Sequence, residues 1–380
     1  MTEDEILDLL TLHLTPGVGP MRLTALLNRF GSASDVLRAD ETDLEGITGV
    51  GVKIAQALRD RGNRDRAQQE LRRARDRGIC VVARGSHDYP ADLCEIPGAP
   101  TFLFIRGELL PADRFGAGIV GTRHPTAYGR RLTQQLALGL ARAGACVISG
   151  LARGIDGIAH TAALDAGGRT IAVLAGGFDR IYPPEHRELA ERIVLAGALI
   201  TESVPSQEPL KGLFPARNRI ISGLARAVVI VQAGESSGAL ITAEHAAEQG
   251  RPTLAVPGPV DEEQSAGCHR LIRDGATLCR GVEDVLVEMR GLLPQSPEPD
   301  RDVDTPAPHR GVDAPHSPAP RPKMTDDEGQ VYELLEQGTR SVDDLAQSSG
   351  LSVAKLSGLL LTMQLKKLVR QLPGNRYEKT

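Results

Sequence analysis

The 380-residue sequence contains no tryptophan, and only 3% of its residues are aromatic. This scarcity argues against a long base-stacking platform, which needs several aromatic side chains in a row. The formal net charge is -5, so the molecule as a whole is not a polycation. Any affinity for nucleic acid must therefore come from a local basic patch that acts mainly on phosphates.

Cysteine pairs, basic leader segments and long apolar runs are also missing. The five cysteines form no CxxC pair, so we expect buried thiols and no metal site. No apolar run is long enough to span a bilayer, and the first residues, MTEDEILDLL, lack the basic region of a signal peptide. We expect a cytoplasmic protein with no membrane span.

The common nucleotide-binding motifs fail on inspection. The letters GAGIVG at Gly116 fit the dinucleotide pattern, but the last glycine closes an apolar run and opens no helix. A P-loop needs a Gly-Lys pair, and no lysine here follows a glycine. Ordinary NAD and ATP sites are therefore disfavoured, and we expect no cofactor.

Residues 64–293 alternate short apolar runs with helical segments. Seven runs have the length and β-branched composition of buried parallel strands: GICVVA, GIVGT, ACVIS, TIAVLAGG, ALITE, AVVIVQAG and TLAVPG. This pattern predicts an α/β domain with a doubly wound, Rossmann-like sheet. Ligands of such sheets bind at the carboxyl ends of the strands.

A chain of 380 residues is longer than one hydrophobic core usually organises, and three further segments flank this domain. Residues 1–63 place Gly-Val-Gly twice before an amphipathic helix, as in a SAM-like helix-hairpin-helix domain; the glycines either meet a phosphate or only close tight turns. Residues 294–322 form a proline-rich linker. Residues 323–380 read as a winged helix, whose recognition helix at Ser352–Leu365 has so few cations that we favour a protein-contact role.

Glycine-rich segments follow several of the strands. The stretch SGLARGIDGIAH, which starts at Ser149, combines close backbone approach with the start of a helix, and such loops make anion sites. We expect a phosphate to be held at these strand ends, which contribute Arg123, Gly150, Arg153, Gly154, Ser237 and Gly238.

A basic segment, EPLKGLFPARNRIISGL, lies between two strands. A cluster of this kind is often a solvated helix start, but its place beside glycine-rich strand ends favours binding. We therefore add Lys211, Phe214, Arg217, Asn218 and Arg219 to the candidate site. Two other polar residues receive structural interpretations, Asp156 as a helix N-cap and His160 as a hydrogen-bonded core residue.

Seven separated motifs resemble one family in order and spacing. They are IVGTRHPTAYG, VISGLARGIDGIAH, TIAVLAGGFDRIYPPEH, LFPARNRIISGLA, SSGALITAEHA, AVPGPV and LIRDGA, preceded by YPADLCEIPGAPTFLFIRGE. Together they resemble the DNA-processing protein A (DprA, or Smf) family from about Gly78 to Leu286. One departure is Gly267-Cys268-His269, where the family usually has Gly-x-Asn.

The resemblance implies a homodimeric single-stranded DNA-binding protein that protects strands and helps to load the RecA recombinase in natural transformation or recombination. It also places the family's arginine, lysine and phenylalanine at Arg123, Lys211 and Phe214. We find no nucleophile with its base, so no catalytic residue is predicted and we do not expect an enzyme. The alternative is a nucleoside-monophosphate phosphoribohydrolase that uses Thr242 and Glu244.

Overall fold

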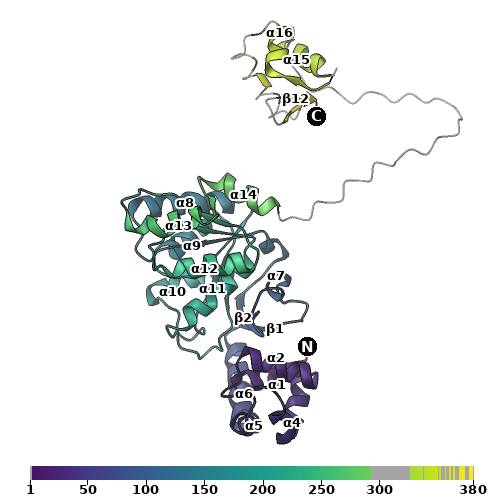
Figure 1. Ribbon diagram of the computed structural model, residues 1–380, viewed down its shortest axis with the longest axis vertical. Helices are drawn as coiled ribbons and strands as arrows, with labels where there is room; N and C mark the ends of the chain where they lie inside the picture. The colour runs from purple at the N-terminus through teal and green to yellow at the C-terminus, as the bar shows by residue number, and fades with distance from the viewer. Residues whose placement is uncertain are drawn as a thin grey trace, which may run out of the picture. The chain divides into compact units, whose positions relative to one another are not determined.

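The computed structural model (Figure 1) describes residues 2–291, 326–336, 338–349, 351, 356, 359–360, 363, 368–372 and 376–379. Two compact units divide the chain, Met1–Glu298 and Pro299–Thr380. The proline-rich linker expected at 294–322 lies outside the described residues, as does most of the recognition helix expected at Ser352–Leu365. None of the helices in the described part of the chain has the length and apolar character that a membrane crossing requires.

Six helices open the first unit: α1 (Glu3–Leu14), α2 (Pro20–Phe30), α3 (Ala33–Arg38), α4 (Glu41–Glu45), α5 (Val52–Leu58) and α6 (Arg61–Asp76). Each Gly-Val-Gly segment ends at the glycine that caps the next helix, α2 or α5. The Arg22 side chain joins the two turns, because it donates 2.8 Å hydrogen bonds to the carbonyl oxygens of Gly17 and Gly49. The helical N-terminal domain is confirmed.

Nine strands form one sheet in the order β1-β2-β6-β5-β4-β3-β7-β8-β9. Their bounds are β1 (Cys80–Ala83), β2 (Phe102–Gly107), β3 (Gly116–Val120), β4 (Cys146–Ser149), β5 (Thr170–Val173), β6 (Gly197–Thr201), β7 (Ala227–Ile230), β8 (Thr253–Ala255) and β9 (Thr277–Leu278). Strands β3 to β9 pair in parallel. The interpretation of GICVVA as a buried parallel strand is wrong, because β1 is a partly exposed edge strand that pairs antiparallel with β2.

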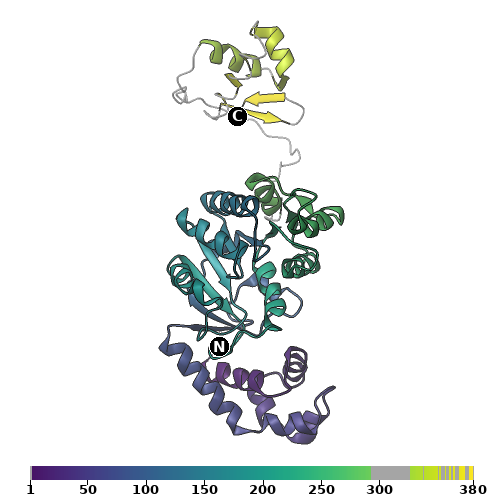
Figure 2. The same cartoon turned by 90° about the vertical axis from the view of Figure 1, so that its left-hand side faces the viewer.

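Helices cover both faces of this sheet (Figures 1 and 2). Along β7, Val228 and Ile230 enter one apolar cluster and Val229 enters another, as the alternation of side chains along a strand requires. The first cluster receives side chains from α7 (Ala91–Cys94), α11 (Leu213–Leu224), α12 (Gly238–Glu248) and α13 (Ala266–Arg273). The second receives them from α8 (Ala127–Arg142), α9 (Ile155–Asp165) and α14 (Val282–Gly291). The doubly wound Rossmann-like core is confirmed.

The remaining elements of this unit are the helix α10 (Arg187–Ala196) and three short 3-10 helices, η1 (Pro111–Arg114), η2 (Pro184–His186) and η3 (Glu263–Ser265). Three of the cysteines are buried, but Cys80 and Cys94 are exposed. The expectation of five buried thiols is therefore wrong for these two, since Cys80 opens the edge strand β1.

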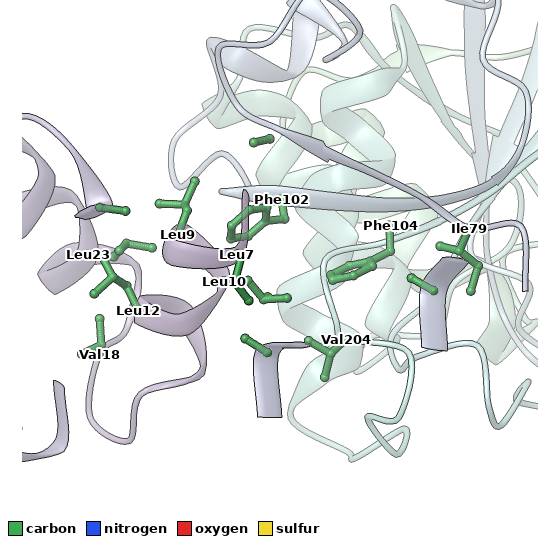
Figure 3. Packing of buried hydrophobic residues seen from close by; sticks show 14 of the residues in the cluster. Leu7, Leu9, Leu10, Leu12, Val18, Leu23, Ile79, Phe102, Phe104 and Val204 are labelled. Carbon is green, nitrogen blue, oxygen red and sulfur yellow. The ribbon is translucent and has the colours of Figure 1, made fainter. Parts of the chain in front are cut away.

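The N-terminal helices and the sheet share one hydrophobic cluster (Figure 3). Leu7 and Leu10 of α1 belong to the same buried cluster as Phe102 and Phe104 of β2 and Val204, which follows β6. The helix α6 runs unbroken through residues 63 and 64, where the sequence interpretation divides two domains. Its buried residues are mostly small or polar, so the apolar pattern gave no sign of its length.

The second unit has its own small core. Its described elements are α15 (Asp326–Glu336), β10 (Arg340–Ser341), α16 (Val342–Ser349), β11 (Val369–Leu372) and β12 (Arg376–Lys379). The sheet order is β10-β12-β11, and both pairs are antiparallel. Leu356, Leu360 and Met363 are buried in the cluster beneath this sheet. The segments LVRQL and NRYEK thus contribute the antiparallel strand pair that a winged helix requires.

Candidate nucleic-acid interface

A pocket opens at the carboxyl edge of the sheet, where the strand order reverses between β3 and β7. Its volume is about 760 Å³, which lies within the usual range for small-ligand sites. Loops that follow β3, β4 and β7 contribute to its wall, together with the start of α11 and the start of α12. Adjacent parallel strands whose crossovers leave in opposite directions create such a crevice.

Gln232 fixes two of these loops to each other. Its amide oxygen accepts a 3.0 Å hydrogen bond from the backbone N–H of Thr126, and its amide nitrogen donates a 3.0 Å bond to the Thr126 hydroxyl. Thr126 in turn caps the N-terminus of α8. The buried Gln232 side chain therefore holds the β3 loop, which carries Arg123, in a set position beside the β7 loop.

The start of α12 faces the same pocket. Ser237 caps this helix, and its hydroxyl accepts a hydrogen bond from the backbone N–H of Ala239. Asn218 of α11 donates a 3.2 Å bond to the carbonyl oxygen of Gly238, so α11 holds the end of α12 in place. The positive end of the helix dipole thus lies beside Arg123 and Lys211, which also line the pocket.

Two aromatic rings lie between two cations, of which Arg123 lines the pocket and Arg153 does not. The guanidinium of Arg123 lies 5.6 Å from the centre of the Phe214 ring, and the ring of Tyr182 meets Phe214 edge to face at 5.6 Å. The guanidinium of Arg153 lies 5.8 Å from the centre of the Tyr182 ring. Arg123 and Lys211 are both exposed. This arrangement offers charge for phosphates and aromatic faces for one or two bases.

Arg153 also has an acidic partner. It forms a salt bridge with Glu185, and both side chains are about half exposed. The hydrogen bond from Arg153 lowers the pKa of the Glu185 carboxyl, which therefore stays ionised. A phosphate must compete with this carboxylate before it can pair with Arg153, whereas no ion pair of this kind involves Arg123 or Lys211 among the described residues.

The glycine-rich stretch after β4 holds a carboxylate of its own chain. The Oδ2 atom of Asp156 accepts hydrogen bonds from the backbone N–H groups of Gly150 and Ala152, at 3.1 and 3.3 Å. Burial raises the pKa of the Asp156 carboxyl. Asp156 lies in the first turn of α9, and Gly154 is the N-cap, so the N-cap assignment of Asp156 is wrong. The amides of Gly150 and Ala152 are therefore already hydrogen-bonded within the protein.

Both glycines of this stretch make room for protein atoms. A side chain at Gly150 would overlap the guanidinium of Arg217. Gly154 has a φ of +76°, and a side chain there would meet the backbone of Thr122 and Arg123. Close packing within the protein thus accounts for these two glycines.

Arg217 lies beneath the pocket surface. Only 4% of this residue is exposed, and its Nη1 atom donates a 2.7 Å hydrogen bond to the carbonyl oxygen of Val173. Burial lowers the pKa of Arg217 to about 10, although the nearby Asp156 carboxylate opposes this shift. The cation therefore stays protonated at neutral pH and braces the strand-end loops from below.

Arg219 faces away from the pocket and has internal partners throughout. Its Nη1 and Nη2 atoms donate to the two carboxylate oxygens of Glu202 at 2.9 and 2.6 Å, and its Nε atom donates to the carbonyl oxygen of Gly98. A bidentate pair of this kind fixes the guanidinium plane. Of the Arg-Asn-Arg run, Arg217 and Asn218 line the pocket and Arg219 does not.

His160 lies in the core, as the sequence indicated, but only one ring nitrogen has a partner. Its Nδ1 atom lies 2.7 Å from the Thr170 hydroxyl, while Nε2 has no hydrogen-bond partner. Burial lowers the pKa of His160 to about 3. The ring is therefore neutral in the folded protein.

Several residues of the site escaped the sequence interpretation. Tyr182 lines the pocket and Arg180 lines a neighbouring hollow with Phe214, although both lie within a quoted motif, TIAVLAGGFDRIYPPEH. An aromatic residue and a cation soon after a strand end were the available signal. For the enzyme alternative, Thr242 lines the pocket, but Glu244 is exposed and does not. No cluster of metal-ligating side chains occurs within the described ranges.

Three family models match the chain. Residues 80–290 match DNA recombination-mediator protein A, residues 314–375 match the DprA winged helix domain, and residues 6–61 match a SAM-like helix-hairpin-helix tandem. Among curated proteins, the chain is 34% identical over 381 residues to Protein Smf of Synechocystis sp., covering 96% of each chain.

Two solved structures are similar to this fold. The X-ray structure of DNA processing protein A from Streptococcus pneumoniae matches with a TM-score of 0.61 and 34% identity, covering 76% of this chain and 98% of that one. A structure from Helicobacter pylori, described as showing the single-stranded DNA binding mode of DNA processing protein A, matches with a TM-score of 0.51 and 28% identity. It covers 56% of this chain and 96% of that one.

Proposed function

This chain belongs to the DNA processing protein A family, and we propose that it binds single-stranded DNA in the pocket between β3 and β7. The observation that carries the proposal is the combination in one pocket of exposed Arg123 and Lys211, the N-terminus of α12 and the Phe214–Tyr182 ring pair. Phosphates need the first two features and unpaired bases need the third.

The contacts divide by position in the pocket. Arg123 and Lys211 neutralise phosphates, and the Ser237–Gly238 start of α12 receives a further phosphate oxygen. Phe214 stacks on a base, with Tyr182 at its edge, and Arg153 joins once a phosphate displaces Glu185.

The other candidate residues hold these contacts in place. Gly150 and Gly154 permit close packing, Arg217 and Asn218 support the strand ends and α12, and Arg219 ties α11 to Glu202. The residues expected to touch DNA thus separate into a contacting set and a supporting set.

We further propose that the bound strand is protected and passed to the RecA recombinase, and that the protein acts in the cytoplasm as a homodimer. We also propose that the strand is held without being cut. The exposed position of Glu244 weighs against the phosphoribohydrolase alternative, which needs that carboxylate in the pocket.

The direct test is fluorescence anisotropy with a labelled single-stranded oligonucleotide, its duplex as competitor, and the full-length protein. We expect preference for the single strand, because the duplex hides its base faces from Phe214. Equal affinity for both forms, or no binding, would contradict the proposal. In a parallel assay, release of free base from nucleoside monophosphates would favour the enzyme alternative.

A further inference from the structure

The helix α6 is the most basic segment of the first unit. Seven of the seventeen residues from Arg61 to Arg77 are arginine, against three acidic residues. The buried face of the helix consists of Asn63, Ala67, Glu70 and Ala74, so none of the arginines is needed for packing. A concentration of charge of this size on one helix needs a partner or a solvated surface.

Some of these arginines are paired within the protein. Arg64 and Arg75 form salt bridges with Asp8 and Glu3, which both lie on α1. Arg73 and Arg77 both pair with the single carboxylate of Asp179 and remain 40% and 46% exposed. One carboxylate thus neutralises only half of the charge of its two partners.

Three further arginines carry unneutralised charge. Arg61, Arg66 and Arg72 are exposed and have no ion-pair partner among the described residues. Arg66, Arg73 and Arg77 are spaced by seven and four positions, which places them on one side of the helix. Arg72 lines a surface hollow of about 360 Å³ together with Arg73, Arg77, Gln69 and one acidic residue, Asp76.

The location of α6 connects this surface to the pocket. Asp179 follows β5 and Ser206 follows β6, and the backbone N–H of Ser206 donates a 3.1 Å hydrogen bond to Glu70. The arginines therefore meet the sheet at its carboxyl edge, the edge that also carries the pocket. Arg180, next to Asp179, lines the hollow that contains Tyr182 and Phe214. Basic residues thus continue from the pocket, through Arg180, toward α6.

We propose that Arg66, Arg72, Arg73 and Arg77 bind the phosphates of a DNA strand as it leaves the pocket past Arg180. Phosphate oxygens replace the Asp179 carboxylate, which is exchangeable because its pairs with Arg73 and Arg77 are open to solvent. This second surface rests on the proposed function, since it extends the strand held at Phe214. This second surface determines the length of single strand that the protein binds.

The test compares strand lengths in the full-length protein. Arg66→Ala with Arg72→Ala removes two exposed, unpaired charges and leaves a good helix former at both positions. We expect unchanged affinity for a single strand of about 5 nucleotides, which the pocket alone holds, and several-fold weaker affinity for one of about 20, since single-strand sites span on the order of 4–16 nucleotides per module. The salt slope for the long strand should fall by about 1.4, at about 0.7 for each phosphate contact.

The control variant is Arg142→Ala with Arg273→Ala. It removes the same amount of positive charge from two exposed helix ends, each of which leads into the amino end of the next strand. These positions therefore lie at the edge of the sheet opposite the pocket. If the α6 variant binds both strand lengths like this control, the proposal is overturned and an acidic protein surface becomes the better partner for α6. If the wild type binds neither strand, the proposed function fails as well, so the two failures are distinguishable.

Discussion

The two exposed cations of the pocket should control how the affinity for single-stranded DNA depends on salt. Replacing Arg123 and Lys211 together by alanine removes two phosphate contacts. Each such contact contributes about 0.7 to the slope of log affinity against log salt, so the slope should become shallower by about 1.4. From 50 to 200 mM salt, the ratio of mutant to wild-type Kd should therefore shrink about sevenfold.

Phe214 should behave differently, because stacking on a base involves no counterion. Phe214→Ala should weaken binding by about 1–3 kcal/mol at every salt concentration. At low salt we expect this loss to be smaller than that of the double cation variant, since phosphates dominate. Arg123 lies over the Phe214 ring, so Arg123→Ala also removes support for that ring. Lys211→Ala measured singly separates the two effects.

The assay is fluorescence anisotropy with a labelled strand of about 20 nucleotides, a length that exceeds one binding module. Arg142→Ala with Arg273→Ala serves as the control for net charge, and its slope should match that of the wild type. An unchanged slope for the Arg123 and Lys211 variant would refute the assignment of these two side chains to phosphates. If Phe214→Ala lost more affinity at low salt than the Arg123 and Lys211 variant, stacking on a base would be the larger contribution to binding.

Two other perturbations test the supporting structure. Below pH 6.5 the unfolded chain protonates His160, whereas the folded protein does so only near the lowered pKa of about 3. The free energy of unfolding should therefore fall by about 2 kcal/mol between pH 6.5 and 5. In thermal unfolding, His160→Gln should lack this part of the decline, and a decline identical to that of the wild type would contradict the argument. Gly150→Ala forces the Arg217 guanidinium to move and should cost about 1–3 kcal/mol. Gly212→Ala, where a side chain meets open space, is its control in the same melt, and equal melting temperatures would contradict the packing argument.

Much of the sheet was predictable because buried parallel strands have a strong local pattern. The runs that became β3 to β8 are short, β-branched and bounded by glycine or polar residues. Strand β2 has an equally apolar run, FLFIRG, but nothing local indicates that it pairs antiparallel with β6. GICVVA resembles a buried strand by composition, and only its place at the sheet edge makes it different.

The site was predictable at the level of loops and less so at the level of atoms. Glycines at a strand end indicate close approach, but the pattern is the same whether a ligand or the protein itself approaches. Asp156 occupies the amides of Gly150 and Ala152, and Arg217 lies under Gly150. Asp156 lies only six residues from Gly150, but its type alone does not show that it occupies these amides. Arg217 is too far away in the sequence for its contact with Gly150 to be recognised without the fold.

The cluster shared by α1 and β2 has a consequence for how deletion variants are interpreted. Without residues 1–63, Phe102 and Phe104 would lose the leucines that cover them, and α6 would lose its N-cap Asp60 and its first three residues. Such a shortened protein exposes an apolar face and self-associates, so its failure to retain DNA would report on solubility rather than on which part of the chain grips the strand. Point substitutions on intact protein are the sounder means of mapping the interface.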